Sequence, residues 1–186
     1  MAAKTWTLAN AISGARLVLL APLAYCLFNE FEGHRLWAAG IVALGALSDF
    51  ADGFLARRLH EVSELGKVID PIADKVGIGV LAIFLVVLGD IPLWYVVVVL
   101  VRDILILSGG LLIKSKKGIV VQSNWPGKIA VSLIAGYLLL SLLRMEGLTA
   151  WRDASLWSSV AFMTISLGVY ARRLFIGRKV DATGRE

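Results

Sequence analysis

Residues Ser48–Lys75 read SDFADGFLARRLHEVSELGKVIDPIADK and place four aspartates in a chain that is otherwise mostly apolar. The four are Asp49, Asp52, Asp70 and Asp74. An ionised carboxylate is costly to remove from water without a partner, so four of them between long apolar runs need a shared reason. Their spacing, and the runs that flank them, decide the fold and the chemistry that the sequence predicts.

The composition of the 186-residue chain is typical of a membrane protein. Hydrophobic residues make up 58% of it, charged residues 18%, and the mean hydropathy is +0.78. A helix needs about 20 apolar residues to cross the hydrocarbon layer. Six such runs can be placed, at about 8–28, 35–57, 67–88, 91–113, 125–144 and 152–175. We therefore expect an all-α integral membrane protein, with six transmembrane helices in one bundle and a single domain over 1–186.

Basic residues are distributed unevenly between the two sets of predicted loops. One set, with both termini, carries most of them, whereas the other holds only Arg35, Arg144 and Arg152. Because cytoplasmic loops are enriched in Lys and Arg, we expect both termini and loops 58–66 and 114–124 on the cytoplasmic side. This topology explains the net charge of +5 without nucleic acid. It predicts a multi-pass protein in contact with membrane lipids, in a bacterial inner membrane.

The four aspartates fall on two stripes of helix surface. The first stripe follows the spacing i, i+3, i+4, i+7, i+8 and consists of Asp49, Asp52, Gly53, Ala56 and Arg57. The second follows i, i+4, i+8 and consists of Gly66, Asp70 and Asp74. Since the connector between the two helices is short, we expect antiparallel neighbours whose stripes face each other. The four carboxylates would then converge at about one depth, near the cytoplasmic side.

Converging carboxylates repel one another strongly at low dielectric constant unless cations neutralise them. Neither histidine, His34 or His60, falls on the stripes, so the ligand atoms are all oxygen and a hard ion is expected. The sequence thus predicts two divalent cations, Mg²⁺ or Mn²⁺, that share the ligands Asp49, Asp52, Asp70 and Asp74. Salt bridges from Lys67 and Lys75 to the second stripe are the structural alternative, but they do not explain the small residues on the same faces.

The pattern Asp49-x2-Asp52-Gly53-x2-Ala56-Arg57-x8-Gly66-x3-Asp70-x3-Asp74 resembles, at every fixed position, the signature of the CDP-alcohol phosphotransferase family. These are membrane enzymes of phospholipid synthesis. The resemblance extends to the six-helix layout and to the opening segment LANAISGAR at 8–16, and it becomes general beyond Lys75. It implies a reaction in which an acceptor hydroxyl attacks the β-phosphorus of CDP-diacylglycerol, forms a phosphodiester and releases CMP.

Residue roles are implied by this resemblance, position by position. Asp49, Asp52 and Asp70 would be the main metal ligands. Asp74 would be the general base and a further ligand. The CDP site would be shaped by Gly53, Ala56, Arg57 and Gly66. The resemblance also implies a homodimer.

Basic residues outside the signature are candidates for binding the acceptor alcohol, namely Arg16, Arg102, Lys114 and Lys128. Arg102 lies inside an apolar run, where it would contact an anionic substrate or pair with an acid. The two lysines could equally be interfacial anchors. A phosphate-bearing acceptor is favoured, and with the resemblance this indicates glycerol 3-phosphate and the product phosphatidylglycerophosphate. The Arg102-Asp103 pair is instead similar to that of cardiolipin-forming members, whose acceptor is phosphatidylglycerol; inositol phosphate and serine stay open.

A cation transporter or channel would also carry acids inside a membrane. The Gly-x2-Ala-Arg between the acid pairs has no evident use in such a protein, so the enzyme is favoured. Release of CMP from CDP-diacylglycerol, set against ion flux in liposomes, separates the two functions.

Overall fold

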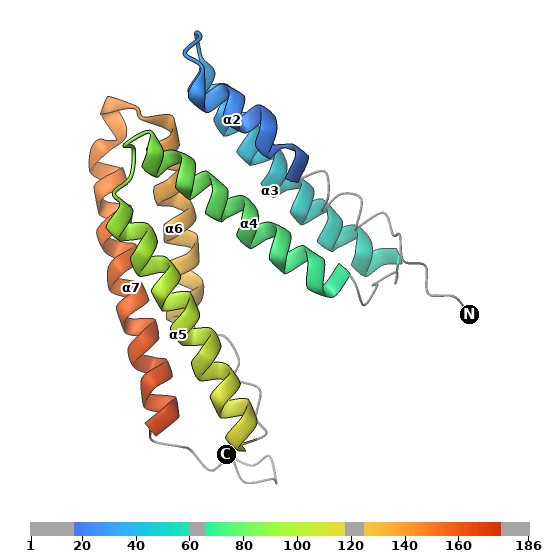
Figure 1. Ribbon diagram of the computed structural model, residues 1–186, viewed down its shortest axis with the longest axis vertical. Coiled ribbons are helices and arrows are strands. Elements are labelled where there is room, and N and C mark those ends of the chain that lie inside the picture. Colours follow the sequence, from blue (N-terminus) through green and yellow to red (C-terminus); the bar gives the residue numbers. More distant parts are fainter. Residues whose placement is uncertain (1–16, 60–65, 118–124, 176–186) are drawn as a thin grey trace. The chain divides into compact units, whose positions relative to one another are not determined.

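The computed structural model describes residues 17–59, 66–117 and 125–175, with side chains described except at 49–59, 66–74, 111–117 and 173–175. Within these ranges every regular element is helical (Figure 1). The elements are α2 (Leu20–Phe28), α3 (His34–Leu59), α4 (Gly66–Val87), α5 (Leu93–Lys117), α6 (Trp125–Leu143), the 3-10 turn η1 (Glu146–Leu148) and α7 (Thr149–Phe175). The all-α prediction is confirmed for this part of the chain, and each predicted apolar run overlaps one α-helix.

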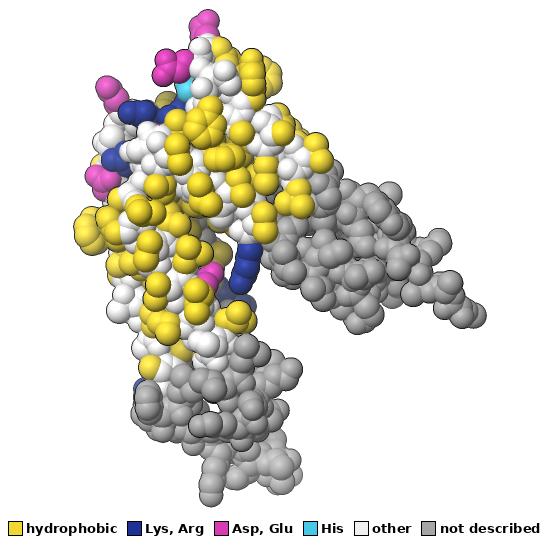
Figure 2. All heavy atoms as spheres, viewed as in Figure 1, with side chains coloured by type: hydrophobic (Ala, Val, Ile, Leu, Met, Phe, Trp, Pro, Cys, Tyr) yellow, Lys and Arg dark blue, Asp and Glu magenta, His cyan; other side chains and the backbone are white. Residues whose placement is uncertain are grey.

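Three stretches of the described helices are long and apolar enough to cross a membrane, and they are Leu93–Gly110, Trp125–Leu143 and Glu146–Arg172. On α5, apolar side chains face outward, among them Leu93 and Ile104, each 63% exposed. Hydrophobic side chains also cover much of the visible described surface in Figure 2. Contiguous exposed apolar surface on long helices is typical of contact with lipid. The chain is therefore a membrane protein, while six spans in one bundle stay a prediction.

The chain divides into two compact units, one of 1–91 with 141–144 and one of 92–140 with 145–186. In the first unit α2 packs against α3 and α4. The rings of Phe28 and Phe84 meet edge to face with their centroids 5.4 Å apart. The Nδ1–H of His34 donates to the Cys26 carbonyl at 2.9 Å and fixes the turn between α2 and α3. The apolar core of this unit includes Leu23, Leu27, Ala38, Leu81 and Leu85.

In the second unit α5 packs against α7, and the two helices run in the same direction (Figure 1). Tyr95 on α5 contacts Ser159 on α7 with 2.7 Å between their hydroxyl oxygens, and Arg102 contacts Ser166. Both pairs are separated by 64 residues in sequence, so the contact repeats in register after seven residues on each helix. A seven-residue repeat keeps one seam between two helices. Small serines on α7 thus accommodate the large polar side chains of α5.

Candidate active site

The four signature aspartates are divided between two helices of the first unit. Asp49 and Asp52 lie on α3 and Asp70 and Asp74 on α4, close to the ends that residues 60–65 connect. Both stripes therefore lie on continuous helix, as predicted. Their side chains are outside the described ones, as are those of the other signature residues, Gly53, Ala56, Arg57 and Gly66. Elsewhere in the described chain, no group of three or more His, Cys, Asp or Glu side chains gathers around a common point.

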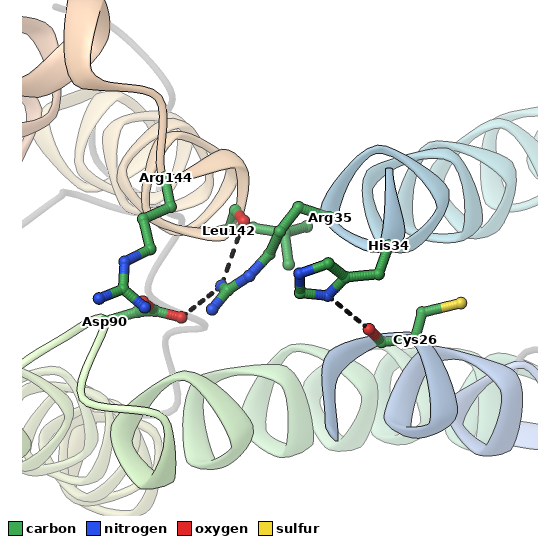
Figure 3. Close-up of polar contacts among 6 residues, drawn as sticks. All are labelled: Cys26, His34, Arg35, Asp90, Leu142 and Arg144. Carbon is green, nitrogen blue, oxygen red and sulfur yellow. Dashed lines mark hydrogen bonds and ion pairs between the residues drawn. The ribbon is translucent and has the colours of Figure 1, made fainter. Parts of the chain in front are cut away.

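The far ends of α3 and α4 are joined by a charged contact. Arg35, the second residue of α3, donates from Nη1 to Oδ2 of Asp90, which follows the end of α4 (Figure 3). The amide of Asp90 donates to the Leu85 carbonyl at 2.8 Å, so Asp90 is folded back toward the last turn of α4. The opposite ends are joined by the short connector 60–65. The two helices are therefore linked at both ends and run in opposite directions (Figure 1).

Helix geometry then sets the levels of the four acidic positions. An α-helix rises 1.5 Å per residue, so Asp49 and Asp52 lie roughly 21 and 25 Å from Arg35 along α3. From the last residue of α4, Asp74 and Asp70 lie roughly 20 and 25 Å along that helix. Measured along each helix, Asp49 and Asp74 are thus at similar distances from this link, and so are Asp52 and Asp70. These distances agree with the expected convergence of the four carboxylates, which stays a prediction.

Asp90 is the buried centre of a charge cluster that was not predicted from the sequence (Figure 3). Its side chain is 2% exposed and meets two arginines. Arg35 also donates to the Leu142 carbonyl at 3.3 Å, and Nη1 of Arg144 lies 3.4 Å from Oδ1 of Asp90. These are two of the three arginines assigned to the non-cytoplasmic loops. The sequence did contain a signal for this cluster: a lone acid between two apolar runs, together with arginines at the ends of two other helices.

We expect Asp90→Ala to lower the free energy of unfolding by about 3–5 kcal/mol, because Arg35 would keep a largely buried charge without its partner. Thermal or denaturant unfolding of the purified protein in detergent measures the loss. Asp153→Ala is the matched control, since Asp153 is exposed and pairs with Arg152 at 3.2 Å. Surface pairs contribute about 0–1 kcal/mol. Equal losses in the two variants would contradict a stabilising role for the Asp90 cluster.

Arg102 lies nearly buried on α5 in the second unit, with 7% of the residue exposed. Its Nη1 donates to Oδ1 of Asp103 at 2.7 Å, and its Nη2 donates to the Ser166 hydroxyl at 3.4 Å. Its Nε has no hydrogen-bond partner among the described residues. Among the described residues, the acid that pairs with this arginine is therefore its neighbour on the same helix. An arginine with one unsatisfied donor inside an apolar helix is a candidate for binding an anionic ligand.

The structure describes the other basic candidates for acceptor binding less completely. The Lys128 ammonium lies 5.6 Å from the centroid of the Trp125 ring, in the first turn of α6. A cation over an exposed tryptophan at a helix end is typical of an interfacial anchor. Lys114 lies on α5 with its side chain outside the described ones, and Arg16 precedes the described residues.

Comparison with known proteins gives a family match over most of the chain. Residues 6–165 match the family model for CDP-alcohol phosphatidyltransferase. The chain is 31% identical over 170 residues to a "Probable phosphatidylglycerophosphate synthase" of Mycobacterium tuberculosis, covering 90% of this chain and 80% of that protein. It is 30% identical over 177 residues to a CDP-diacylglycerol–glycerol-3-phosphate 3-phosphatidyltransferase of Bacillus subtilis, covering 87% and 91%. A CMP-forming cardiolipin synthase of Streptomyces coelicolor is 36% identical over 104 residues, covering 54% and 48%.

Proposed function

Because the chain belongs to the CDP-alcohol phosphatidyltransferase family, we propose that it transfers a phosphatidyl group from CDP-diacylglycerol to an acceptor alcohol and releases CMP. The observation that carries this proposal is the complete acidic signature on α3 and α4, two helices linked at both ends. The family match covers the whole signature and also Arg102. A cation transporter would need the acids but not the Gly-x2-Ala-Arg that lies between them.

We propose that the four aspartates hold two divalent cations, Mg²⁺ or Mn²⁺. The donor set fits such ions, because it contains only carboxylate oxygens and its positions lie at similar distances along two helices that are linked at both ends. Bound cations would neutralise the pyrophosphate of the CDP-lipid and stabilise the leaving phosphate. The ligands would be Asp49, Asp52, Asp70 and Asp74.

The chain's own residues then supply the proton transfer and the shape of the nucleotide site. Asp74 takes the proton of the acceptor hydroxyl. The hydroxyl oxygen forms a bond to the β-phosphorus while the bond from that phosphorus to the bridging oxygen breaks, so CMP leaves with the electron pair. Gly53, Ala56 and Gly66 leave room beside the acids for the cytidine and pyrophosphate. Arg57, on the same stripe as Asp49, provides positive charge for the pyrophosphate.

For the acceptor, we propose glycerol 3-phosphate, which would make the product phosphatidylglycerophosphate. The buried, incompletely bonded Arg102 supports an acceptor with its own phosphate. The names of the Mycobacterium tuberculosis and Bacillus subtilis relatives agree with this acceptor. The further basic residues in the proposed acceptor site are Arg16, Lys114 and Lys128. Phosphatidylglycerol is the alternative, supported by the Arg102-Asp103 pair and by the name of the Streptomyces relative.

Purified enzyme supplied with CDP-diacylglycerol and each acceptor in turn tests this choice. We expect glycerol 3-phosphate to give the fastest release of CMP. Arg102→Ala should raise the KM for glycerol 3-phosphate by about 10- to 100-fold, because it removes a hydrogen bond to a charged group, and should leave the KM for CDP-diacylglycerol nearly unchanged. Arg152→Ala, which removes an arginine paired with exposed Asp153, is the control.

Each other outcome of this experiment has a distinct meaning. Faster release of CMP with phosphatidylglycerol, inositol phosphate or serine would change the proposed acceptor but would agree with the proposed phosphatidyl transfer. Ion flux in liposomes without CMP release would exclude the proposed enzymatic function and favour a cation transporter.

We also propose that all six helices span a bacterial inner membrane, with the acids and both termini toward the cytoplasm and the enzyme a homodimer. Exposed tryptophans support the span limits, because such residues mark membrane interfaces. Trp37, Trp94 and Trp151 lie near the starts of α3, α5 and α7, and Trp125 begins α6, which returns across the membrane in the proposed topology. The particle mass in mild detergent tests the dimer, and a fully active monomer would remove it.

A further inference from the structure

Among the described residues, two side chains hold Arg102, and only one of them carries charge. Asp103 engages Nη1 at 2.7 Å from the neighbouring position on α5, and its side chain is 40% exposed. Ser166 comes from α7 and accepts a bond from Nη2 at 3.4 Å; it is fully buried. A flexible arginine side chain can adopt many rotamers, so two fixed contacts on opposite terminal nitrogens restrict where Nε points.

From this arrangement we propose that Ser166 is a positioning residue, which orients the guanidinium of Arg102 so that Nε and Nη2 can receive the anionic group of the acceptor. The proposal rests on the function proposed above. Asp103 supplies the counter-charge that allows an ionised arginine in an apolar helix. Ser166 adds a neutral contact from the facing helix, which does not compete electrostatically with an incoming phosphate. Its hydroxyl would thus act on acceptor binding through Arg102, without touching the reacting atoms.

The seven-residue repeat between α5 and α7 supplies a matched control. Ser159 lies one repeat before Ser166 on the same seam and is equally buried. It donates to the Leu156 carbonyl at 2.7 Å, so the Tyr95 hydroxyl must donate to it. Ser159→Ala and Ser166→Ala therefore delete the same hydroxyl group from two fully buried positions on one helix. Among the described residues, Ser166 contacts an arginine and Ser159 does not.

The test measures KM and kcat of full-length enzyme with glycerol 3-phosphate as the varied acceptor. We expect Ser166→Ala to raise the acceptor KM by about 3- to 10-fold, which corresponds to one modest hydrogen bond. The kcat and the KM for CDP-diacylglycerol should stay close to those of the unaltered enzyme. Ser159→Ala should leave all three values unchanged, and Ser166→Thr, which keeps the hydroxyl, should restore a near-normal acceptor KM.

A double-mutant cycle identifies the route of the effect. If Ser166 acts through Arg102, Ser166→Ala should cause no further rise in acceptor KM when Arg102 is already alanine. Additive effects of the two substitutions, or equal effects of Ser166→Ala and Ser159→Ala, would overturn the proposal. If Ser166→Ala does not fold, the comparison of Ser166→Val with Ser166→Thr carries the test, because these two side chains have the same shape and differ in the hydroxyl.

Failure of the inference can be distinguished from failure of the proposed function. If Arg102→Ala raises the acceptor KM and Ser166→Ala does not, Ser166 is not a positioning residue although the function stands. If the unaltered enzyme releases no CMP with any acceptor, the proposed function fails, and the inference fails with it.

Discussion

EDTA is expected to abolish CMP release from CDP-diacylglycerol, and excess Mg²⁺ or Mn²⁺ to restore it. Without cations, the proposed cluster of four carboxylates would repel the pyrophosphate of the substrate instead of binding it. The measurement is CMP formed by purified enzyme before chelation, in chelator and after each ion is added back. Full turnover in chelator would exclude the metal-dependent mechanism.

Substitution of single aspartates tests which residues bind the proposed cations. Asp49→Ala, Asp52→Ala and Asp70→Ala should each raise the Mg²⁺ concentration that gives half-maximal activity, because each removes a charged ligand. Glu32→Ala is a suitable control, since Glu32 is an exposed acid in the turn before α3. An unchanged Mg²⁺ requirement in all three aspartate variants would place the ions elsewhere in the protein.

The second prediction with a large expected effect concerns Asp74, the proposed general base. Asp74→Asn should lower kcat by about 10²- to 10⁴-fold, because the amide keeps the shape of the side chain but cannot take the proton of the acceptor. Binding of CDP-diacylglycerol should change much less, so kcat and KM separate in this variant. Raising the Mg²⁺ concentration should not restore turnover, in contrast to the three ligand variants. Near-normal turnover would show that Asp74 is not the base.

Helix positions were predictable from the sequence because apolar runs and turn residues both mark them. The expected runs 35–57 and 67–88 correspond to α3 and α4 within two residues at each end. The break after α4 follows from GDIP, where Gly89 adopts a φ of 73° that disfavours other residues. For the first run, 8–28, the helix is described from Leu20 onward. The residues before position 17 lie outside the described chain.

Tertiary partners were much less predictable, since periodicity assigns a residue to a helix face without saying what lies opposite. The signature named all four acids, yet the facing of their side chains stays a prediction. Asp90 looked like one polar residue of a turn, and only the fold brings Arg35 to it. Ser166 is one of several serines on α7, and nothing in its local sequence distinguishes it from Ser159. Such contacts depend on helix register, which a single sequence does not encode visibly.

The link between Arg35 and Asp90 also fixes the orientation of α3 relative to α4 at the ends far from the acids. The acids lie roughly 20–25 Å from this fixed point, so a rotation of about 5° there would displace them by about 2 Å. Ligand distances in a metal site are expected to lie within about 0.2 Å of their usual values. In the proposed topology, a contact on one side of the membrane would thus control the alignment of the proposed metal ligands on the other. Loosening it should reduce cation affinity in Asp90 variants that remain folded.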